Sequence, residues 1–279
     1  MHTICICGAG TMGSGIAQVA AASGFTTILF DVNTTVLEKA EDKLRTDLQK
    51  LVEKQKIAAE KKDEILKNIQ FTSAIEHCIA DVVIEAIIEK PELKIALFNQ
   101  LSAINPATAI FASNTSSLSI TELAQNIINP ERFAGLHFFN PAPLMKLVEV
   151  VKGEQTSAEV INILVKLSRT FGKIPVVCKD SPGFIVNRVA RPYYLESLRL
   201  VEQDVAGFET IDRLLEDKGF KMGPFRLMDL IGNDVNYSVS CSVYEQLKNP
   251  VRLKPSPIQK EKVENGALGR KTGKGYYTY

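Results

Sequence analysis

The sequence predicts an α/β fold: a doubly wound, mostly parallel sheet followed by a smaller all-helical region. Short apolar runs alternate with amphipathic runs through residues 1–180, the pattern of parallel strands joined by crossover helices. A glycine-rich turn joins the first apolar run to the first amphipathic one. The alternation stops at Asp180-Ser181-Pro182-Gly183. We therefore expect two domains, residues 1–181 and residues 182–279.

The predicted strands of the first domain are short and apolar, and the first two are continuous apolar runs typical of strands buried on both faces. They span residues 3–8, 26–31, 69–72, 81–88, 108–114, 146–151 and 173–179, and a further strand ends near His137. The predicted helices span residues 12–23, 91–104 and 156–172. Residues 33–68 are long, polar and amphipathic, so we expect a helix pair that projects from the sheet.

The second domain contains no run with the pattern of a strand. Its predicted helical segments are residues 184–206, 209–219, 224–248 and 256–266. The tail, residues 268–279, is rich in Gly, Lys and Tyr, and we expect an ordered loop there.

Composition limits the possible functions. Apolar residues make up 45% of the chain and the formal net charge is +1, which favours a globular protein over a nucleic-acid or membrane-surface protein. The five cysteines match no paired metal or redox spacing, so we expect free thiols, a reducing compartment and no metal site. No run of about 18 apolar residues and no leader pattern is present, and we expect a cytoplasmic protein without a membrane span.

Gly8, Gly10 and Gly13 form a G-x-G-x-x-G motif between the first strand and the first helix, which opens with Thr11 and Met12. Such a turn lets the backbone approach a pyrophosphate at the start of the helix. Asp31 ends the next strand, where a carboxylate would accept hydrogen bonds from the adenosine ribose and repel a 2′-phosphate. The motif predicts NAD rather than NADP; the alternative is a glycine turn that binds no ligand.

Polar residues also lie at the ends of two later predicted strands, 81–88 and 108–114. Glu85 and Glu89 lie at the end of the first of these strands, and Lys94 lies on the following helix. These residues could contact a cofactor. Alternatively, the carboxylate could interact with the start of the helix and the lysine could be solvated. Ser116 and Ser117 follow the next strand. A hydroxyl beside a substrate is one interpretation, and a helix N-cap is the other, although Ser119 or Thr121 could also serve as the cap.

His137 is the strongest candidate for proton transfer. It lies near the end of a predicted strand, and Glu149 lies in the next apolar run, where it could reach the imidazole across a hairpin. A carboxylate on one ring nitrogen fixes the tautomer and raises the basicity of the other. A lone histidine among apolar residues is otherwise more often a core group. His2 and His77 have no such neighbour.

An asparagine and two lysines are further candidates for contact with a substrate. Asn187 follows the domain boundary and could donate to a substrate oxygen, or could form an interhelical hydrogen bond. Lys50 and Lys54 lie on the projecting helix pair, where they could bind a substrate phosphate or form a solvated face.

Taken together, these motifs resemble the L-3-hydroxyacyl-CoA dehydrogenases, and especially the short-chain bacterial 3-hydroxybutyryl-CoA dehydrogenases. The resemblance covers essentially the whole chain and rests on six motifs in the family's order: GAGTMGSGIAQ, ASNTSSLSIT, GLHFFNPAPLMKLVEVV, DSPGFIVNR, MGPF with DLIG, and LGRKTGKGYY. It implies a Rossmann domain that binds NAD, with an all-helical C-terminal domain that mediates homodimerisation. It also implies an acyl-CoA substrate in the cleft between the domains, partly against the projecting helix pair.

The resemblance also assigns roles to residues. It makes His137 the general base and Glu149 the group that orients it, with Ser116 and Asn187 on the substrate. The cofactor contacts that it implies, beyond the glycine turn, are Asp31, Glu89, Lys94, Ser116, Asn140 and Lys274.

The implied activity is NAD-dependent oxidation of a (3S)-3-hydroxyacyl-CoA, such as 3-hydroxybutyryl-CoA, to the 3-oxoacyl-CoA. Residues 193–212 and 232–247 are more similar to the phenylacetate-pathway members that act on 3-hydroxyadipyl-CoA. Arg191 could meet the distal carboxylate of such a substrate, although an exposed helix arginine is the simpler expectation. A dehydrogenase of a sugar acid and a non-catalytic NAD-binding scaffold are the remaining alternatives.

Overall fold

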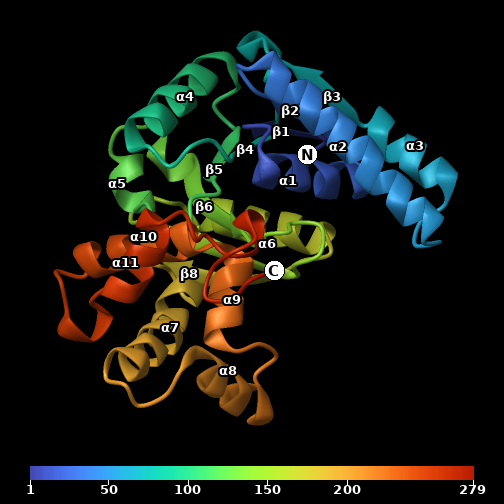
Figure 1. The fold of residues 1–279 in the computed structure, drawn as a ribbon. Helices are drawn as coiled ribbons and strands as arrows, with labels where there is room; N and C mark the ends of the chain where they lie inside the picture. Colours follow the sequence, from blue (N-terminus) through green and yellow to red (C-terminus); the bar gives the residue numbers. More distant parts are fainter. The chain divides into compact units, whose positions relative to one another are not determined.

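Eight strands form one sheet in the first of two compact units, in the order β3-β2-β1-β4-β5-β6-β7-β8 (Figure 1). The computed structural model describes all residues, and the units are Met1–Asp180 and Ser181–Tyr279. The strands are β1 Thr3–Cys7, β2 Thr26–Phe30, β3 Ile69–Thr72, β4 Val82–Glu85, β5 Ile110–Ser113, β6 Phe133–Phe138, β7 Leu147–Lys152 and β8 Ile174–Lys179. Every neighbouring pair is parallel except β6 and β7, which are antiparallel. The predicted doubly wound, mostly parallel sheet is confirmed.

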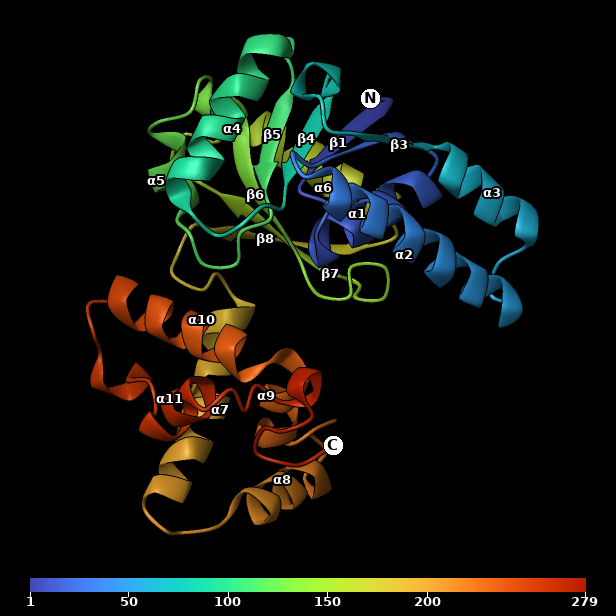
Figure 2. The same cartoon turned by 45° about the horizontal axis from the view of Figure 1, so that its top comes forward.

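Helices cover both faces of the sheet (Figure 2). The helices of this unit are α1 Thr11–Ala22, α2 Thr34–Glu53, α3 Ala59–Lys67, α4 Pro91–Ile104, α5 Ile120–Ala124 and α6 Ala158–Thr170. Residues of α1 and α6 share a buried apolar cluster with Ile4 and Ile6 of β1. On α4, Phe98 packs edge-to-face on Phe111 and Phe133, from β5 and β6. Central strands covered in this way must be apolar on both faces, which is why they read as continuous runs.

The helices α2 and α3 lie side by side in the region expected to form a helix pair. The side chain of Asn33 caps α2 by accepting a hydrogen bond from the N–H of Thr35 at 3.0 Å. The apolar face of α2, with Leu37, Leu44 and Leu48 buried, joins the same cluster as α1. Figure 1 shows the pair, in blue to cyan, extending beyond the strands.

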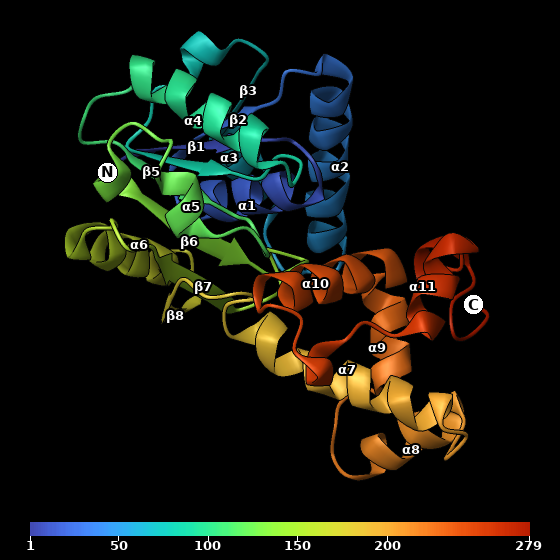
Figure 3. The same ribbon diagram turned by 90° about the vertical axis from the view of Figure 1, so that its left-hand side faces the viewer.

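The second unit is helical, as predicted (Figure 3). Its helices are α7 Val186–Glu202, α8 Phe208–Asp217, α9 Pro224–Ile231, α10 Asn233–Gln246 and α11 Pro257–Glu264. The predicted segment 224–248 is not continuous, because it breaks at Gly232 into α9 and α10. Gly232 has φ +106°, a conformation that glycine adopts without strain and that ends a helix.

Two buried aspartates organise the second unit. Asp229 of α9 accepts the backbone N–H groups of Tyr276 and Tyr277 at 2.9 and 3.0 Å, and Asp212 of α8 accepts the hydroxyl of Tyr277 at 2.8 Å. Gly275 is required beside Asp229, because a Cβ there would lie 2.0 Å from a carboxylate oxygen. The tail is therefore an ordered segment bound to the helices, as expected.

Candidate active site

The strand order brings the carboxyl ends of β1, β4, β5 and β6 next to one another. In an open parallel sheet, ligands bind beyond these ends, where successive connections leave the sheet in opposite directions. In this sheet that point lies between β1 and β4, because β2 and β3 follow on one side of β1 and β4 and β5 follow on the other. All the residues of the first unit that the motifs singled out, except Lys50 and Lys54 on α2, lie at or just beyond this edge.

The glycine turn after β1 has the geometry that a dinucleotide requires. Gly8 has φ +101°, and a Cβ on it would lie 2.7 Å from the carbonyl oxygen of Ala86. A Cβ on Gly13 would lie 1.7 Å from the carbonyl oxygen of Gly8, so the helix can start only with glycine there. A Cβ on Gly10 would meet nothing within 4 Å, and this residue is exposed. The turn is thus closed on the protein side and open on the side where a pyrophosphate would lie.

The carboxylate of Asp31 lies beside this turn. One oxygen accepts the N–H of Ala9 at 2.9 Å, and the other accepts the N–H of Asn33 at 2.9 Å. At the start of α1, Thr11 is exposed and Met12 is half-buried. An anionic carboxylate held at the end of β2 suits a ribose with two free hydroxyls better than one that carries a phosphate. The residues present therefore fit NAD.

A buried lysine joins two carboxylates at the end of β4. The ammonium of Lys94 lies 2.5 Å from Glu85 and 3.1 Å from Glu89, and the Lys94 side chain is 1% exposed. The expectation of a solvated lysine is therefore wrong, because Lys94 points inward from α4 to the end of the strand. Burial raises the pKa of Glu85, although Lys94 opposes that effect. Burial also acts on Glu89, but Lys94 and hydrogen bonds outweigh it and lower its pKa.

Glu89 also organises the loop after β5. It accepts hydrogen bonds from the hydroxyl of Thr115, from the N–H of Ser116 at 3.2 Å and from the hydroxyl of Ser117 at 3.2 Å. The helix cap is a different residue, Ser119, whose hydroxyl accepts the N–H of Glu122 at 3.1 Å. The N-cap explanation for Ser116 and Ser117 is therefore wrong.

His137 and Glu149 face each other across the only antiparallel pair of the sheet. They are directly opposite in the register of β6 and β7, and Nδ1 of His137 lies 2.7 Å from Oε2 of Glu149. Both residues are buried, at 5% and 1% exposed. A carboxylate bound to Nδ1 places the proton there, so that Nε2 is the nitrogen that can accept a proton. The pair has the arrangement of a general base whose imidazole is oriented by a carboxylate.

The connection between β6 and β7 carries Asn140, which is exposed and lies two residues beyond the end of the His137 strand. Asn114 is a further residue of this edge that the motifs did not indicate: its side-chain oxygen accepts the N–H of Phe138 at 2.8 Å and so joins the end of β5 to the end of β6. An asparagine directly after a strand, one residue before the Thr-Ser-Ser run, was the available signal.

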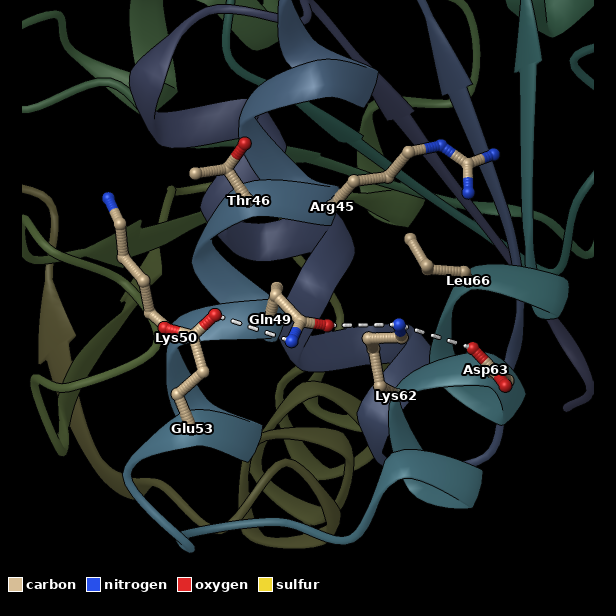
Figure 4. Close-up of a pocket in the computed structure, with 8 residues that line it drawn as sticks. All are labelled: Arg45, Thr46, Gln49, Lys50, Glu53, Lys62, Asp63 and Leu66. Carbon is tan, nitrogen blue, oxygen red and sulfur yellow. Dashed lines mark hydrogen bonds and ion pairs between the residues drawn. The ribbon is translucent and has the colours of Figure 1, made fainter.

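Lys50 lines a cavity of about 460 Å³ between α2 and α3, whereas Lys54 lies at the end of α2 and is not part of its lining. Figure 4 shows Lys62 of α3 reaching Gln49 of α2, at 3.1 Å. The lining combines three cations with two carboxylates and consists of Arg45, Thr46, Gln49, Lys50, Glu53, Lys62, Asp63 and Leu66. A phosphate group would find basic side chains here.

Two candidate residues belong to the helical unit. Asn187 is half-buried in the first turn of α7, and Lys274 is exposed in the tail. The expectation that Arg191 is an exposed helix residue is wrong, because it is 2% exposed. Its guanidinium donates to the carbonyl of Asn236 at 2.9 Å and to the hydroxyl of Ser240 at 2.8 Å, so it joins α7 to α10.

Two family models match the chain: the 3-hydroxyacyl-CoA dehydrogenase NAD binding domain over residues 3–181, and the C-terminal domain over residues 183–279. The NAD cofactor predicted from the glycine turn is confirmed by the first match. No helix of the structure combines the length and the apolar character needed to cross a membrane.

Individual proteins are similar over the whole chain. A 3-hydroxyadipyl-CoA dehydrogenase from Escherichia coli K12 is 49% identical over 100% of this chain, which spans 59% of that protein's length. Pig mitochondrial hydroxyacyl-coenzyme A dehydrogenase is 42% identical, covering 99% of this chain and 90% of that protein. Among solved structures, the (S)-3-hydroxybutyryl-CoA dehydrogenase from Ralstonia eutropha has a TM-score of 0.95 and 37% identity, with 100% of this chain and 99% of that chain covered.

Proposed function

Because the chain belongs to the 3-hydroxyacyl-CoA dehydrogenase family, we propose that it catalyses the reversible, NAD-dependent oxidation of (3S)-3-hydroxyacyl-CoA to 3-oxoacyl-CoA. The observation that carries the proposal is the contact of 2.7 Å between His137 and Glu149, at the same sheet edge as the glycine turn. A buried base oriented by a carboxylate, next to a dinucleotide site, suits an oxidation in which a proton leaves a hydroxyl oxygen and a hydride leaves the carbon that carries it.

In this proposal, Nε2 of His137 takes the proton of the C3 hydroxyl. Glu149 holds the imidazole in the required tautomer and stabilises the imidazolium that forms. The hydroxyl of Ser116 and the amide of Asn187 hydrogen-bond the substrate oxygen as it becomes a carbonyl. NAD, when bound, supplies the acceptor for the hydride that leaves C3. Asp31, Glu89, Lys94, Asn140 and Lys274 hold that cofactor.

We propose that the CoA moiety lies against the projecting helix pair. Lys50 lines the cavity between α2 and α3 and Lys54 lies at the end of α2, so both could approach a phosphate. If this is so, replacing Lys50 and Lys54 with Gln should raise the KM for acetoacetyl-CoA and leave the KM for NADH unchanged. An unchanged KM for acetoacetyl-CoA would remove these lysines from the substrate site.

The acyl chain is proposed to be short, as in 3-hydroxybutyryl-CoA. The alternative, 3-hydroxyadipyl-CoA, is favoured by the relative of that name at 49% identity. The notion that Arg191 binds its distal carboxylate loses support, because this guanidinium is buried against α10.

The decisive experiment measures NADH oxidation with acetoacetyl-CoA and with 3-oxoadipyl-CoA, and repeats both assays with NADPH. The proposal expects turnover of acetoacetyl-CoA with NADH. Higher kcat/KM for 3-oxoadipyl-CoA would assign the dicarboxylic substrate. Binding of NADH without turnover of any acyl-CoA would instead indicate a non-catalytic scaffold, and turnover of free hydroxy acids would indicate a sugar-acid type of dehydrogenase.

We also propose that residues 1–181 form the NAD-binding domain and that residues 182–279 mediate homodimerisation. Light scattering coupled to size-exclusion chromatography tests the dimer directly, and a monomeric mass would contradict it. We further propose a cytoplasmic location, which agrees with the free cysteines.

A further inference from the structure

Lys173, directly before β8, is a buried lysine whose partners are backbone carbonyl groups. It is 8% exposed, and its ammonium donates to the carbonyl of Ala142 at 2.5 Å and to that of Met145 at 2.8 Å, with the carbonyl of Pro143 at 3.5 Å. A buried ammonium is costly unless it is hydrogen-bonded, and hydrogen bonds that involve a charged group are the strong ones. Lys173 therefore holds these three carbonyl groups together.

These carbonyl groups belong to residues 139–146, the loop that connects β6 to β7. Within the loop, the carbonyl of Pro141 accepts the N–H groups of Leu144 and Met145, both at 3.0 Å. This turn leaves the carbonyls of Ala142 and Met145 to be satisfied by another group, and the ammonium of Lys173 satisfies them. Asn140 is the second residue of this loop, which joins the strand of His137 to the strand of Glu149.

The other side of the loop rests on α1. A Cβ added to Gly15 would lie 3.2 Å from Cβ of Ala142 and 3.2 Å from Cδ of Pro143. Gly15 lies two residues after the last glycine of the dinucleotide turn, and Ala142 is 2% exposed. The loop is thus held between the ammonium of Lys173 and the first turns of the helix at whose start the cofactor pyrophosphate is expected.

We propose that Lys173 is a positioning residue for the cofactor site: by gathering the carbonyls of Ala142 and Met145, it seats the β6–β7 loop on α1 and so places Asn140 against the nicotinamide nucleotide. The inference rests on the proposed function only for the role of Asn140. The loop is fixed at both ends by the paired strands β6 and β7, so its middle is the part that needs an additional anchor.

The test replaces Lys173 with Met, which keeps the apolar stem and removes the ammonium. The matched control is Arg132→Met, because Arg132 of the same unit also donates to backbone carbonyls, those of Thr108 and Ala109, but at the opposite end of the strands. Both variants should lower Tm. Only Lys173→Met should weaken the binding of NADH, with a Kd that rises about threefold to tenfold in a fluorescence titration. It should also lower kcat by about tenfold. Lys173→Arg should restore part of both losses.

A second variant, Gly15→Ala, disturbs the same contact without removing a hydrogen bond. Alanine has a higher helix propensity than glycine, so Tm should not fall. The added methyl group would press against Ala142 and should weaken the binding of NADH, as Lys173→Met does. If Lys173→Met does not fold, Gly15→Ala decides the question alone.

Unchanged NADH affinity and kcat in both Lys173→Met and Gly15→Ala would overturn the inference and leave Lys173 a purely structural lysine. An equal loss of NADH affinity in Arg132→Met would overturn it too, because the effect would then be one of general stability. NADH affinity is measured without any acyl-CoA, so failure of the proposed reaction would be seen separately, as an absence of turnover in the wild-type protein.

Discussion

Glu149 of the first unit and Asp229 of the second are buried to the same degree, each 1% exposed, but they serve different ends. Glu149 binds the imidazole of His137, whereas Asp229 binds the N–H groups of Tyr276 and Tyr277. An imidazole gains and loses a proton near neutral pH, and a peptide N–H does not. Burial of a carboxylate therefore does not by itself indicate catalysis. The partner decides whether the carboxylate supports chemistry or architecture.

The largest effect is expected at the imidazole. His137→Gln should lower kcat by about 10² to 10⁴-fold, because the general base is lost while the amide keeps a polar group in its place. NADH affinity by fluorescence titration should stay within about twofold, since the glycine turn is intact. His2→Gln is the control, because His2 is exposed and directly precedes β1, at the opposite end of the strands. A near-normal kcat in His137→Gln would remove this residue from the mechanism.

Asp229→Ala should affect stability instead. It leaves two buried N–H groups without their acceptor, which should lower the free energy of unfolding by about 2–4 kcal/mol. All seven tyrosines lie in residues 193–279 and the chain has no tryptophan, so tyrosine fluorescence during urea unfolding reports on the helical unit. Asp217→Ala, at an exposed end of α8, should change little. A stable Asp229→Ala protein would show that the tail does not depend on this carboxylate.

Glu149→Gln should lower kcat less than His137→Gln does. It keeps the shape and a hydrogen bond but removes the charge that stabilises the imidazolium, so kcat should fall by roughly 10–10²-fold with NADH affinity unchanged. The exposed Glu154→Gln, just beyond β7, should keep full activity. If both substitutions behave alike, Glu149 is no more than a buried strand residue.

The smallest effect is a pH dependence of stability at Glu89. Burial opposes its charge, but Lys94 and the hydrogen bonds from the loop after β5 lower its pKa. Its contribution is therefore present above the ordinary pKa of 4.5 and is lost as the pH falls through the lower value of the folded state. The side chain is 37% exposed, so the effect should be small. Tm measured over acidic pH should fall more steeply for the wild type than for Glu89→Gln.

The doubly wound sheet and the contact between His137 and Glu149 were accessible from the sequence because they depend on local patterns. Continuous apolar runs indicate buried parallel strands, and a histidine and a glutamate on the two arms of a hairpin can meet. The burial of Lys94 and Arg191 was not accessible, because a lysine or arginine on a helix looks the same whether it faces water or a carbonyl. The break at Gly232 was missed for a related reason: an isolated glycine inside a helical pattern is compatible with a continuous helix.

The antiparallel pairing of β6 with β7 has a consequence for how the chain can tolerate insertions and deletions. His137 and Glu149 meet because they are opposite in the register, not because 12 positions separate them. Residues gained or lost in the connection alter only the loop that Lys173 holds, and the two side chains can still face each other. One residue inserted within β7 before Glu149, by contrast, would turn this carboxylate to the other face of the sheet and place an apolar neighbour opposite the imidazole.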